Sequence, residues 1–246
     1  MQTSEWHKRF CEQAEWTRSM RRYLFSQIQI EPGARVLEVG CGTGAILAEL
    51  TSNAVIHGMD INFEYLSLAQ KSAPTARLAC ADAVWLPYAD ASFKAACCHF
   101  FLMWVDAAAA LREMYRVTSF GGWLMALAEP DYGGRIDYPD ELSEIGRLQK
   151  DSLSKQGAQP EMGRRLPGLF YEVGLHEIRF GIIGAESTGE RTPTYPQSEW
   201  QVIESDLKDT VEEDRLAQLR KVDIDAMTKG ERVLFVPTFF AMGRKT

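Results

Sequence analysis

The sequence has no long uncharged apolar run. The longest, at residues 95–105, contains His99 and is too short to cross a bilayer. The segment MQTSEWHKRF at residues 1–10 lacks the apolar centre of a secretory signal peptide. We therefore expect a cytoplasmic protein without a membrane partner.

Basic residues are in the minority. The chain has 27 Lys and Arg against 34 Asp and Glu, a formal net charge of -7, and its arginine clusters are the short pairs Arg21-Arg22 and Arg164-Arg165. A negative surface repels a phosphate backbone unless a local basic patch overrides it. The composition therefore disfavours nucleic acid, and we expect no such partner.

Cysteine is scarce and lacks regular spacing. The cysteines lie at positions 11, 41, 80, 97 and 98, an odd number without the pattern of a disulfide framework. The adjacent Cys97 and Cys98 have no second cysteine pair or histidine cluster at metal-ligand spacing. This pattern favours a reducing compartment and predicts no metal site.

The sequence does contain an alternation of short apolar strands and helical segments. With 246 residues, 46% of them hydrophobic, the chain is expected to form a single domain over residues 1–246. The predicted strands are 35–40, 54–59, 76–80, 93–98 and 122–129, and the predicted helices are 44–51, 63–72 and 106–117. Asp106 is the expected N-cap of the last helix. Such alternation is typical of an α/β fold with a doubly wound, mostly parallel sheet.

The pattern changes on both sides of this alternating region. Residues 1–30 are predicted to form a helical lead-in that acts as a lid. Two late strands, at 175–184 and 232–245, are expected to complete a seven-stranded sheet as an antiparallel pair. The segments 131–174 and 185–231 combine charge with helical patches, and they are predicted to be substrate-recognition insertions.

Three glycines, Gly40, Gly42 and Gly44, follow the first predicted strand in the segment RVLEVGCGTGAIL. They remove side chains from the turn, so a ligand can approach the backbone and the N–H groups of the next helix. This geometry indicates a nucleotide site. Gly40, Gly42 and Ala45 also satisfy the dinucleotide fingerprint, and Asp60 follows about 20 residues later. An NAD(P)-dependent oxidoreductase is therefore an alternative.

Four sequence blocks follow one another along the chain. They are LEVGCGTG at 37–44, GMDIN at 58–62, ADAVWLPYADASFKAACC at 81–98 and LREMYRVTSFGGWLMALAEP at 111–130. Together these blocks resemble the class I S-adenosylmethionine-dependent methyltransferases, a family with a Rossmann-like fold. The resemblance implies methyl transfer from S-adenosylmethionine to a small-molecule acceptor by in-line displacement, with S-adenosylhomocysteine as the product.

The resemblance implies roles for residues around the glycine turn. The methionine end of the cofactor would lie on the backbone of Gly40, Cys41 and Gly42, within a pattern that extends to Gly44. Glu38 would orient this turn or accept a hydrogen bond from the cofactor's amino group. A purely structural acceptor is the alternative role for Glu38.

Residues after the next two strands would hold the nucleoside. Asp60 would accept hydrogen bonds from the ribose diol, for which an ionised acceptor is well suited. Ile61 would pack on the adenine face, and Asp82 and the Ala83 N–H would meet the adenine ring. The alternatives are a helix N-cap for Asp60 and a turn cap for Asp82.

The reacting methyl group is expected near the end of the fourth strand. Cys98 would border the sulfonium, and Trp16 would face it through cation–π attraction, with core packing of Trp16 as the alternative. His99 is the predicted general base because an ordinary histidine pKa suits proton transfer near neutral pH, and Tyr132 is a second candidate. Packing at the strand end is the alternative for His99.

The acceptor is expected to be apolar or aromatic, because residues such as Tyr138 and Trp200 lie in the predicted insertions. A nucleic-acid methyltransferase is a further alternative, although CCHF stands where an Asn/Asp-Pro-Pro-aromatic segment is often found. The oxidoreductase alternative lacks a Tyr-x-x-x-Lys pair. A cofactor-binding protein without catalysis also stays open, and the sequence predicts no particular oligomeric state.

Overall fold

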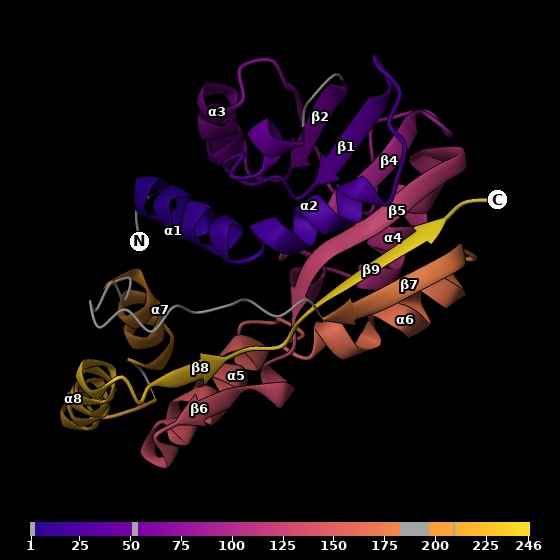
Figure 1. Ribbon diagram of the computed structural model, residues 1–246. Helices are drawn as coiled ribbons and strands as arrows, with labels where there is room; N and C mark the ends of the chain where they lie inside the picture. The colour runs from indigo at the N-terminus through magenta and orange to yellow at the C-terminus, as the bar shows by residue number, and fades with distance from the viewer. Residues whose placement is uncertain (1–2, 51–53, 183–196, 209) are drawn as a thin grey trace. The chain divides into compact units, whose positions relative to one another are not determined.

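The computed structural model describes residues 3–50, 54–182, 197–208 and 210–246 of the chain. The chain divides into two compact units (Figure 1). The first unit consists of Met1–Glu129, Met162–Ala185 and Thr238–Thr246, and the second of Pro130–Glu161 and Glu186–Pro237. Among the described helices, none is long and apolar enough to cross a membrane.

The first unit is built on a seven-stranded sheet with the strand order β3-β2-β1-β4-β5-β9-β7 (Figure 1). Its strands are β1 Arg35–Val39, β2 Val55–Asp60, β3 Arg77–Cys80, β4 Phe93–Cys98, β5 Thr118–Pro130, β7 His176–Ile182 and β9 Thr238–Arg244. The pairs from β3 to β5 are parallel, whereas β7 and β9 pair antiparallel. The predicted mostly parallel sheet, closed by a late antiparallel pair, is confirmed.

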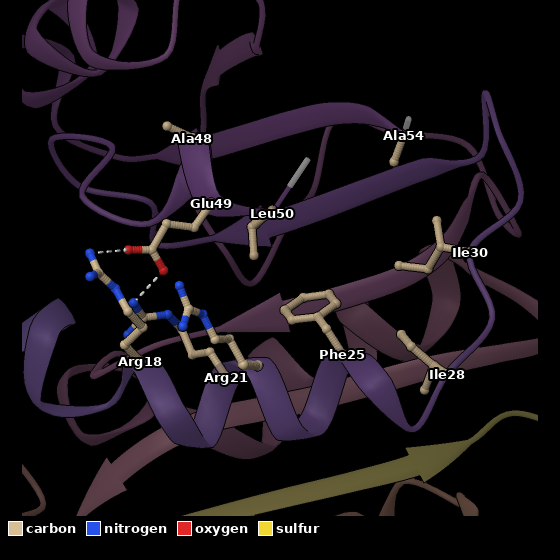
Figure 2. Close-up of a pocket in the computed structure, with 10 residues that line it drawn as sticks. Arg18, Arg21, Phe25, Ile28, Ile30, Ala48, Glu49, Leu50 and Ala54 are labelled. Atoms are coloured by element: carbon tan, nitrogen blue, oxygen red, sulfur yellow. Dashed lines mark hydrogen bonds and ion pairs between the residues drawn. The ribbon is translucent and has the colours of Figure 1, made fainter. Parts of the chain in front are cut away.

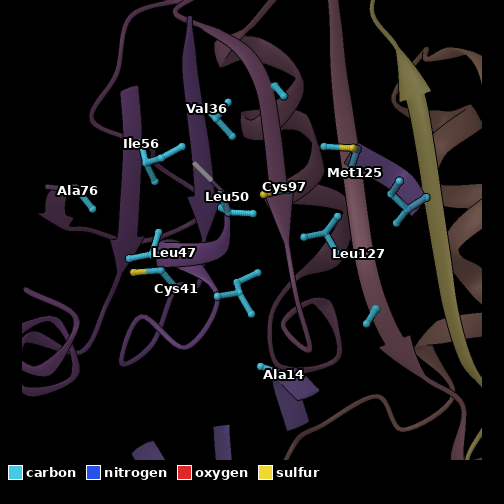
Figure 3. Packing of buried hydrophobic residues seen from close by; sticks show 14 of the residues in the cluster. Ala14, Val36, Cys41, Leu47, Leu50, Ile56, Ala76, Cys97, Met125 and Leu127 are labelled. Atoms are coloured by element: carbon cyan, nitrogen blue, oxygen red, sulfur yellow. The ribbon is translucent and has the colours of Figure 1, made fainter. Parts of the chain in front are cut away.

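Helices cover both faces of this sheet. On one face, Val36, Ala95 and Cys97 join a buried apolar cluster with residues of helices α2 Arg18–Ser26 and α3 Phe63–Ser72 (Figure 3). On the other face, α4 Ala107–Val117 and α6 Met162–Glu172 contact each other and the strands β4 and β9. The sheet is therefore doubly wound, and its central strands are apolar on both sides because both sides are buried.

Side-chain caps fix the starts of α3 and α4. Asn62 accepts hydrogen bonds from the N–H groups of Glu64 and Tyr65 at the start of α3. Asp106 accepts from the N–H group of Ala109, which confirms it as the N-cap of α4. The lead-in is helical as expected, but it consists of two helices, α1 Thr3–Trp16 and α2.

The predicted helix over 44–51 is wrong in its described part. After the glycine turn the chain forms irregular turns and a short 3-10 helix, η1 Leu47–Glu49. Gly44 has a φ of 80°, in the left-handed region that interrupts an α-helix. A Cβ atom on Gly44 would also lie 3.0 Å from Cα of Ala69, so α3 packs directly against this glycine.

The second unit has a small sheet and a core of its own. Strands β6 Ile136–Tyr138 and β8 Val233–Phe235 pair antiparallel. The other elements are the helices α5 Ser143–Lys155, α7 Gln197–Leu207 and α8 Glu213–Lys229 and the 3-10 helices η3 Tyr132–Gly134 and η4 Asp140–Leu142. Apolar residues of α5, α7 and α8 form one buried cluster.

This unit corresponds to most of the described part of the two predicted insertions. The boundary of the first insertion differs, because α6 lies within the predicted range 131–174 but belongs to the first unit. Leu166, Leu169 and Phe170 are buried there, and α6 contacts β9 and β7. Residues 185–196 of the second predicted insertion lie outside the described residues.

Candidate functional site

The glycine turn follows β1 and is hydrogen-bonded to the carboxyl end of β2. The N–H groups of Gly40 and Cys41 both donate to the carbonyl oxygen of Met59, at 2.8 and 2.9 Å. Gly40 has a φ of 72° and Gly42 a φ of 51°, a region in which an L side chain is strained. The backbone of the turn therefore requires glycine at both positions.

Two aromatic rings cover this turn. A Cβ atom on Gly40 would overlap the ring of Phe101, in the segment after β4, and one on Gly42 would lie 3.5 Å from the Phe10 ring of α1. The space that a Cβ atom would need at these two glycines is therefore filled or bordered by phenylalanine rings. Neither phenylalanine is among the predicted site residues, because only the folded chain brings them to the turn.

Glu38 is buried in β1, and Val39 separates it from the turn. Its Oε2 atom has no hydrogen-bond partner among the described residues. Burial raises the pKa of this carboxyl to about 8, and the nearby Arg21 opposes the shift. An unpartnered buried oxygen is unfavourable unless a donor reaches it, and an amino group would be a suitable donor.

Asp60 ends β2 and ties two loops together. Its Oδ2 atom accepts from the Gly42 N–H at 2.8 Å, and Oδ1 accepts from the Asn62 N–H at 2.9 Å. The N-cap of α3 is Asn62, so the N-cap alternative for Asp60 is wrong. Because each carboxylate oxygen has a second acceptor position, Asp60 can hold the turn and still accept from a diol.

The residues predicted to meet an adenine ring lie on adjoining loops. Ile61 follows β2 and is 70% exposed, whereas Ala83, in the loop after β3, is buried. Asp82 is exposed, and its Oδ1 atom accepts from the Val84 N–H at 3.0 Å. Asp82 therefore caps a turn with one carboxylate oxygen. Since β2 and β3 are parallel neighbours, these loops begin at the same edge of the sheet.

His99 follows β4 and is held by the lead-in. Its Nε2 atom lies 2.7 Å from Oγ1 of Thr17, the residue between α1 and α2. Arg21 donates a hydrogen bond to the same hydroxyl oxygen at 2.7 Å. The distances from this hydroxyl to the carbonyl oxygens of Gln13 and Ala14 are 3.4 Å, long for an O–H donor. The shortest contact of the Thr17 hydroxyl with a side-chain acceptor or donor of the strand end is therefore the one to His99, and its direction depends on the tautomer of the ring.

This arrangement makes His99 a poor proton acceptor. Burial, followed by the charge of Arg21, lowers the pKa of His99 to about 3. The ring is thus neutral near pH 7, and its Nε2 atom is already hydrogen-bonded to Thr17. A weakly basic, occupied imidazole disfavours the predicted general base and favours the alternative of packing at the strand end.

The lead-in contacts the glycine region at further points. Nδ1 of His7 lies 2.8 Å from Oγ1 of Thr43, and Arg21 forms an ion pair with Glu49. Trp16 is half exposed, and the guanidinium of Arg9 lies 4.7 Å from the centroid of its ring. The cation that Trp16 meets within the chain is therefore an arginine.

The two predicted cysteines are both buried. Burial raises the pKa of the Cys41 thiol and of the Cys98 thiol, so both remain protonated. A ligand on this turn would meet Cys41 through its backbone. Across the described residues, no cluster of histidine, cysteine and carboxylate side chains could hold a metal ion.

Glu129 is a buried carboxylate that the sequence reasoning does not predict as a site residue. It stands near the end of β5, and its Oε1 atom accepts from the N–H groups of Phe101 and Leu102, both at 2.9 Å. Its Oε2 atom accepts from Met103 at 3.3 Å. Burial raises the pKa of Glu129 to about 7, against the effect of these hydrogen bonds. The available signal was one acidic residue ending the apolar run WLMALAEP.

A cavity of about 710 Å³ lies next to α2 and η1 (Figure 2). Arg18 and Arg21 pair with Glu49 at one end, and the other end is lined by Phe25, Ile28, Ile30, Leu50 and Ala54. Among the described residues, those that line it include none predicted to bind a cofactor. Arg21 links the cavity to Thr17 and so to His99.

Tyr132 lies in the second unit, at the start of η3. Its N–H donates to the carbonyl oxygen of Pro160 at 2.8 Å, and the preceding Asp131 accepts from the Gly133 N–H at 3.0 Å. These contacts fix its backbone within that unit. The catalytic role of Tyr132 stays a prediction.

Comparisons with known proteins place this site in context. The sequence profile of a family described as "Methyltransferase domain" matches residues 37–126, which include the glycine turn, Asp60, Asp82 and His99. The demethylmenaquinone methyltransferase of Deinococcus radiodurans is 37% identical over 192 residues, 68% of this chain and 80% of that protein. The ubiquinone/menaquinone biosynthesis C-methyltransferase UbiE of Xanthomonas campestris pv. campestris is 39% identical over 117 residues, 43% of this chain and 46% of that protein.

A solved structure shares the fold at low sequence identity. Geranyl diphosphate C-methyltransferase from Streptomyces coelicolor A3(2), in complex with Mg2+, geranyl diphosphate and S-adenosyl-L-homocysteine, is similar with a TM-score of 0.58. It is 12% identical, and the match covers 93% of this chain and 79% of that chain. This likeness shows a common Rossmann-like architecture.

Proposed function

The chain belongs to the class I S-adenosylmethionine-dependent methyltransferases, and we propose that its acceptor is a small quinol that is methylated on a ring carbon. The observation that carries this proposal is the 37% identity to a demethylmenaquinone methyltransferase over 80% of that protein's length. The UbiE relative, named as a C-methyltransferase, supports carbon as the reacting atom. A small aromatic acceptor also agrees with the acidic composition of the chain.

The residues around the glycine turn fit S-adenosylmethionine, which supplies a methyl group activated on a sulfonium. We propose that Oε2 of Glu38, buried and unpartnered among the described residues, accepts from the amino group of the methionine end. The backbone of Gly40, Cys41, Gly42 and Gly44 would border the same end of the molecule.

The carboxyl ends of β2 and β3 are proposed to hold the nucleoside. Asp60 has acceptor positions left for a ribose diol after its two backbone hydrogen bonds. Ile61 offers an exposed apolar side chain to adenine, and Asp82 and Ala83 offer an acceptor and a backbone donor. Contacts of Trp16 and Cys98 with the cofactor stay predictions, since Arg9 covers the Trp16 ring and the Cys98 thiol is buried.

We propose that His99 contributes by position. Methyl transfer from a sulfonium depends on holding the nucleophile in line with the methyl group, and this alignment supplies much of the rate. The Thr17 hydroxyl fixes the His99 ring at the end of β4, and burial, together with the charge of Arg21, lowers the pKa of that ring and keeps it neutral. Tyr132 is retained as the second candidate for contact with the acceptor, and the helical lead-in as a lid.

The test is methyl transfer to a short-chain demethylmenaquinol with methyl-labelled S-adenosylmethionine. We expect one label on a ring carbon of the quinol, and no transfer to menaquinol, in which that carbon already carries a methyl group. Binding of S-adenosylhomocysteine is measured in parallel by calorimetry. Tight S-adenosylhomocysteine binding without methyl transfer would remove the quinol proposal and leave the cofactor assignment intact.

A further inference from the structure

Glu129 is buried near the carboxyl end of β5, next to the central strand β4, and it meets no cation in the described contacts. Its side chain is 0% exposed, and its two oxygens accept three consecutive backbone N–H groups, those of Phe101, Leu102 and Met103. A carboxylate that accepts several N–H groups forms strong, charge-assisted hydrogen bonds. Glu129 therefore fixes the path of the chain directly after His99.

This path is otherwise unfavourable. Phe100 has a φ of 49°, a left-handed conformation that is uncommon for a bulky residue, and its N–H donates to Ala128 at 2.8 Å. The segment then continues into η2 Leu102–Trp104. A strained conformation persists only where the surroundings hold it in place. The three N–H groups that Glu129 accepts belong to the residues directly after Phe100.

This path of the chain places Phe101 against the glycine turn. Phe101 is brought so close to Gly40 that any Cβ atom there would overlap its ring. The backbone of Glu129 is in turn closely approached by α6, since a Cβ atom on Gly163 would lie 2.9 Å from the Glu129 carbonyl oxygen. A continuous series of contacts thus connects Glu129, Phe101 and Gly40.

We propose that Glu129 is a positioning residue for methyl transfer: it seats Phe101 on Gly40 and so fixes the turn that receives the methionine end of the cofactor. This inference rests on the proposed cofactor site around Gly40. It assigns no contact between Glu129 and the cofactor. Phe101 would transmit the effect, through a ring that lies on the glycine.

The first experiment compares S-adenosylhomocysteine affinity in the wild type, Glu129→Gln, Phe101→Leu and the double variant. In Glu129→Gln one amide oxygen can retain the bonds to Phe101 and Leu102, but the amide N–H₂ group opposes the Met103 N–H. We expect a roughly tenfold weaker affinity in each single variant and a similar loss in the double variant, because both act through one route. The KM for the acceptor is expected to stay unchanged.

Two outcomes would overturn the proposal. One is wild-type affinity in either folded single variant, and the other is a double variant whose loss equals the sum of the two single losses. Phe101→Leu leaves the buried carboxylate intact. It therefore tests whether the ring on Gly40 affects S-adenosylhomocysteine affinity, even if Glu129→Gln does not fold. Wild-type methyl transfer to the quinol tests the proposed acceptor separately, since these titrations use S-adenosylhomocysteine alone.

A pH series separates positioning from a merely structural role. The carboxylate accepts all three N–H groups only when ionised, so wild-type affinity for S-adenosylhomocysteine should fall as the pH drops through about 7, the value to which burial raises the pKa of Glu129. The titratable side chain facing it from β4 is Cys98, which stays protonated, and α6 meets it through Gly163. The ratio of Glu129→Gln to wild-type affinity should therefore rise toward low pH, and a constant ratio would contradict the proposal.

Discussion

The two units bury charge in different ways. In the second unit, the buried Asp137 receives hydrogen bonds from Arg135 and Arg232, while Asp223 receives them from Arg232 and Trp200. In the first unit, Glu38 keeps an oxygen without a described partner, and Glu129 is met by backbone N–H groups.

The pKa values reflect this difference. Burial raises the pKa of Glu38 to about 8 and that of Glu129 to about 7, so both carboxyls are held in an environment that penalises their charge. Buried pairs such as Arg232 and Asp223 satisfy each other and leave nothing for a ligand. From this difference we expect Glu38, whose Oε2 atom has no described partner, to meet the cofactor's amino group, and the paired carboxylates of the second unit to maintain structure.

The largest effect is expected from breaking a pair in the second unit. Asp223→Ala leaves the buried Arg232 and Trp200 without this acceptor, and loss of one partner of a buried pair lowers the free energy of unfolding by about 3–5 kcal/mol. Urea unfolding measures this, with the exposed Asp225→Ala on the same helix as a control that stays within about 0.5 kcal/mol. The S-adenosylhomocysteine affinity of the folded variant should equal that of the wild type; a weakened affinity would mean that these paired charges also serve the cofactor.

Asp60→Ala should have the next largest effect, on affinity. The variant removes the proposed acceptor of the ribose diol and the anchor of the Gly42 N–H, and hydrogen bonds to a charged group contribute roughly 1.5–3 kcal/mol each. We expect about a 100-fold loss of S-adenosylhomocysteine affinity by calorimetry. Glu64→Ala, a neighbouring exposed carboxylate, is the matched control, and an unaltered affinity in folded Asp60→Ala would exclude Asp60 from the site.

Glu38→Gln tests the raised pKa of Glu38 through the pH dependence of the free energy of unfolding. The pKa of Glu38 is raised in the folded chain to about 8, so the wild type loses stability as the pH rises from the ordinary carboxyl value of 4.5 toward 8. The glutamine variant lacks this loss, and its free energy of unfolding should exceed that of the wild type by roughly 2–4 kcal/mol more at pH 8.5 than at pH 5. Arg21, Asp60 and Glu49 influence the same carboxyl and are present in both proteins. A pH-independent difference would show that Glu38 titrates normally.

Trp16→Leu should have the smallest effect. The guanidinium of Arg9 lies on the Trp16 ring, a contact that contributes about 0.5–1 kcal/mol at a partly exposed position. We expect a stability loss of that size in thermal or urea unfolding, and S-adenosylhomocysteine affinity within about threefold of the wild type. A larger loss of affinity would support the predicted contact between Trp16 and the sulfonium.

The local part of the fold could be predicted from the sequence, and the non-local part could not. The strand at 93–98 and the helix at 63–72 have the predicted bounds, because burial and capping leave local signals. The helix predicted at 44–51 failed because the left-handed conformation at Gly44 depends on the close packing of Ala69. The placement of α6 in the first unit depends on its contact with β9, which comes much later in the chain.

The same division applies to the candidate site. Glu38, Asp60 and Asp82 stand in motifs with fixed local spacing, so the sequence alone predicts that they bind the cofactor. Glu129 and Phe101 meet only when β4 and β5 pair, and the apolar run around Glu129 alone does not reveal what its carboxylate contacts. The sequence did not indicate Thr17 either, because its contact with His99 forms only when the lead-in packs against the end of β4.

The position of β9 has a consequence for synthesis of the chain. β9 lies between β5 and β7, although the ribosome makes it after both. At roughly 5–20 residues per second, several seconds pass between the release of β7 and that of β9, its neighbour in this sheet. During this interval β5 presents an open edge to other nascent chains, which makes it a template for aggregation.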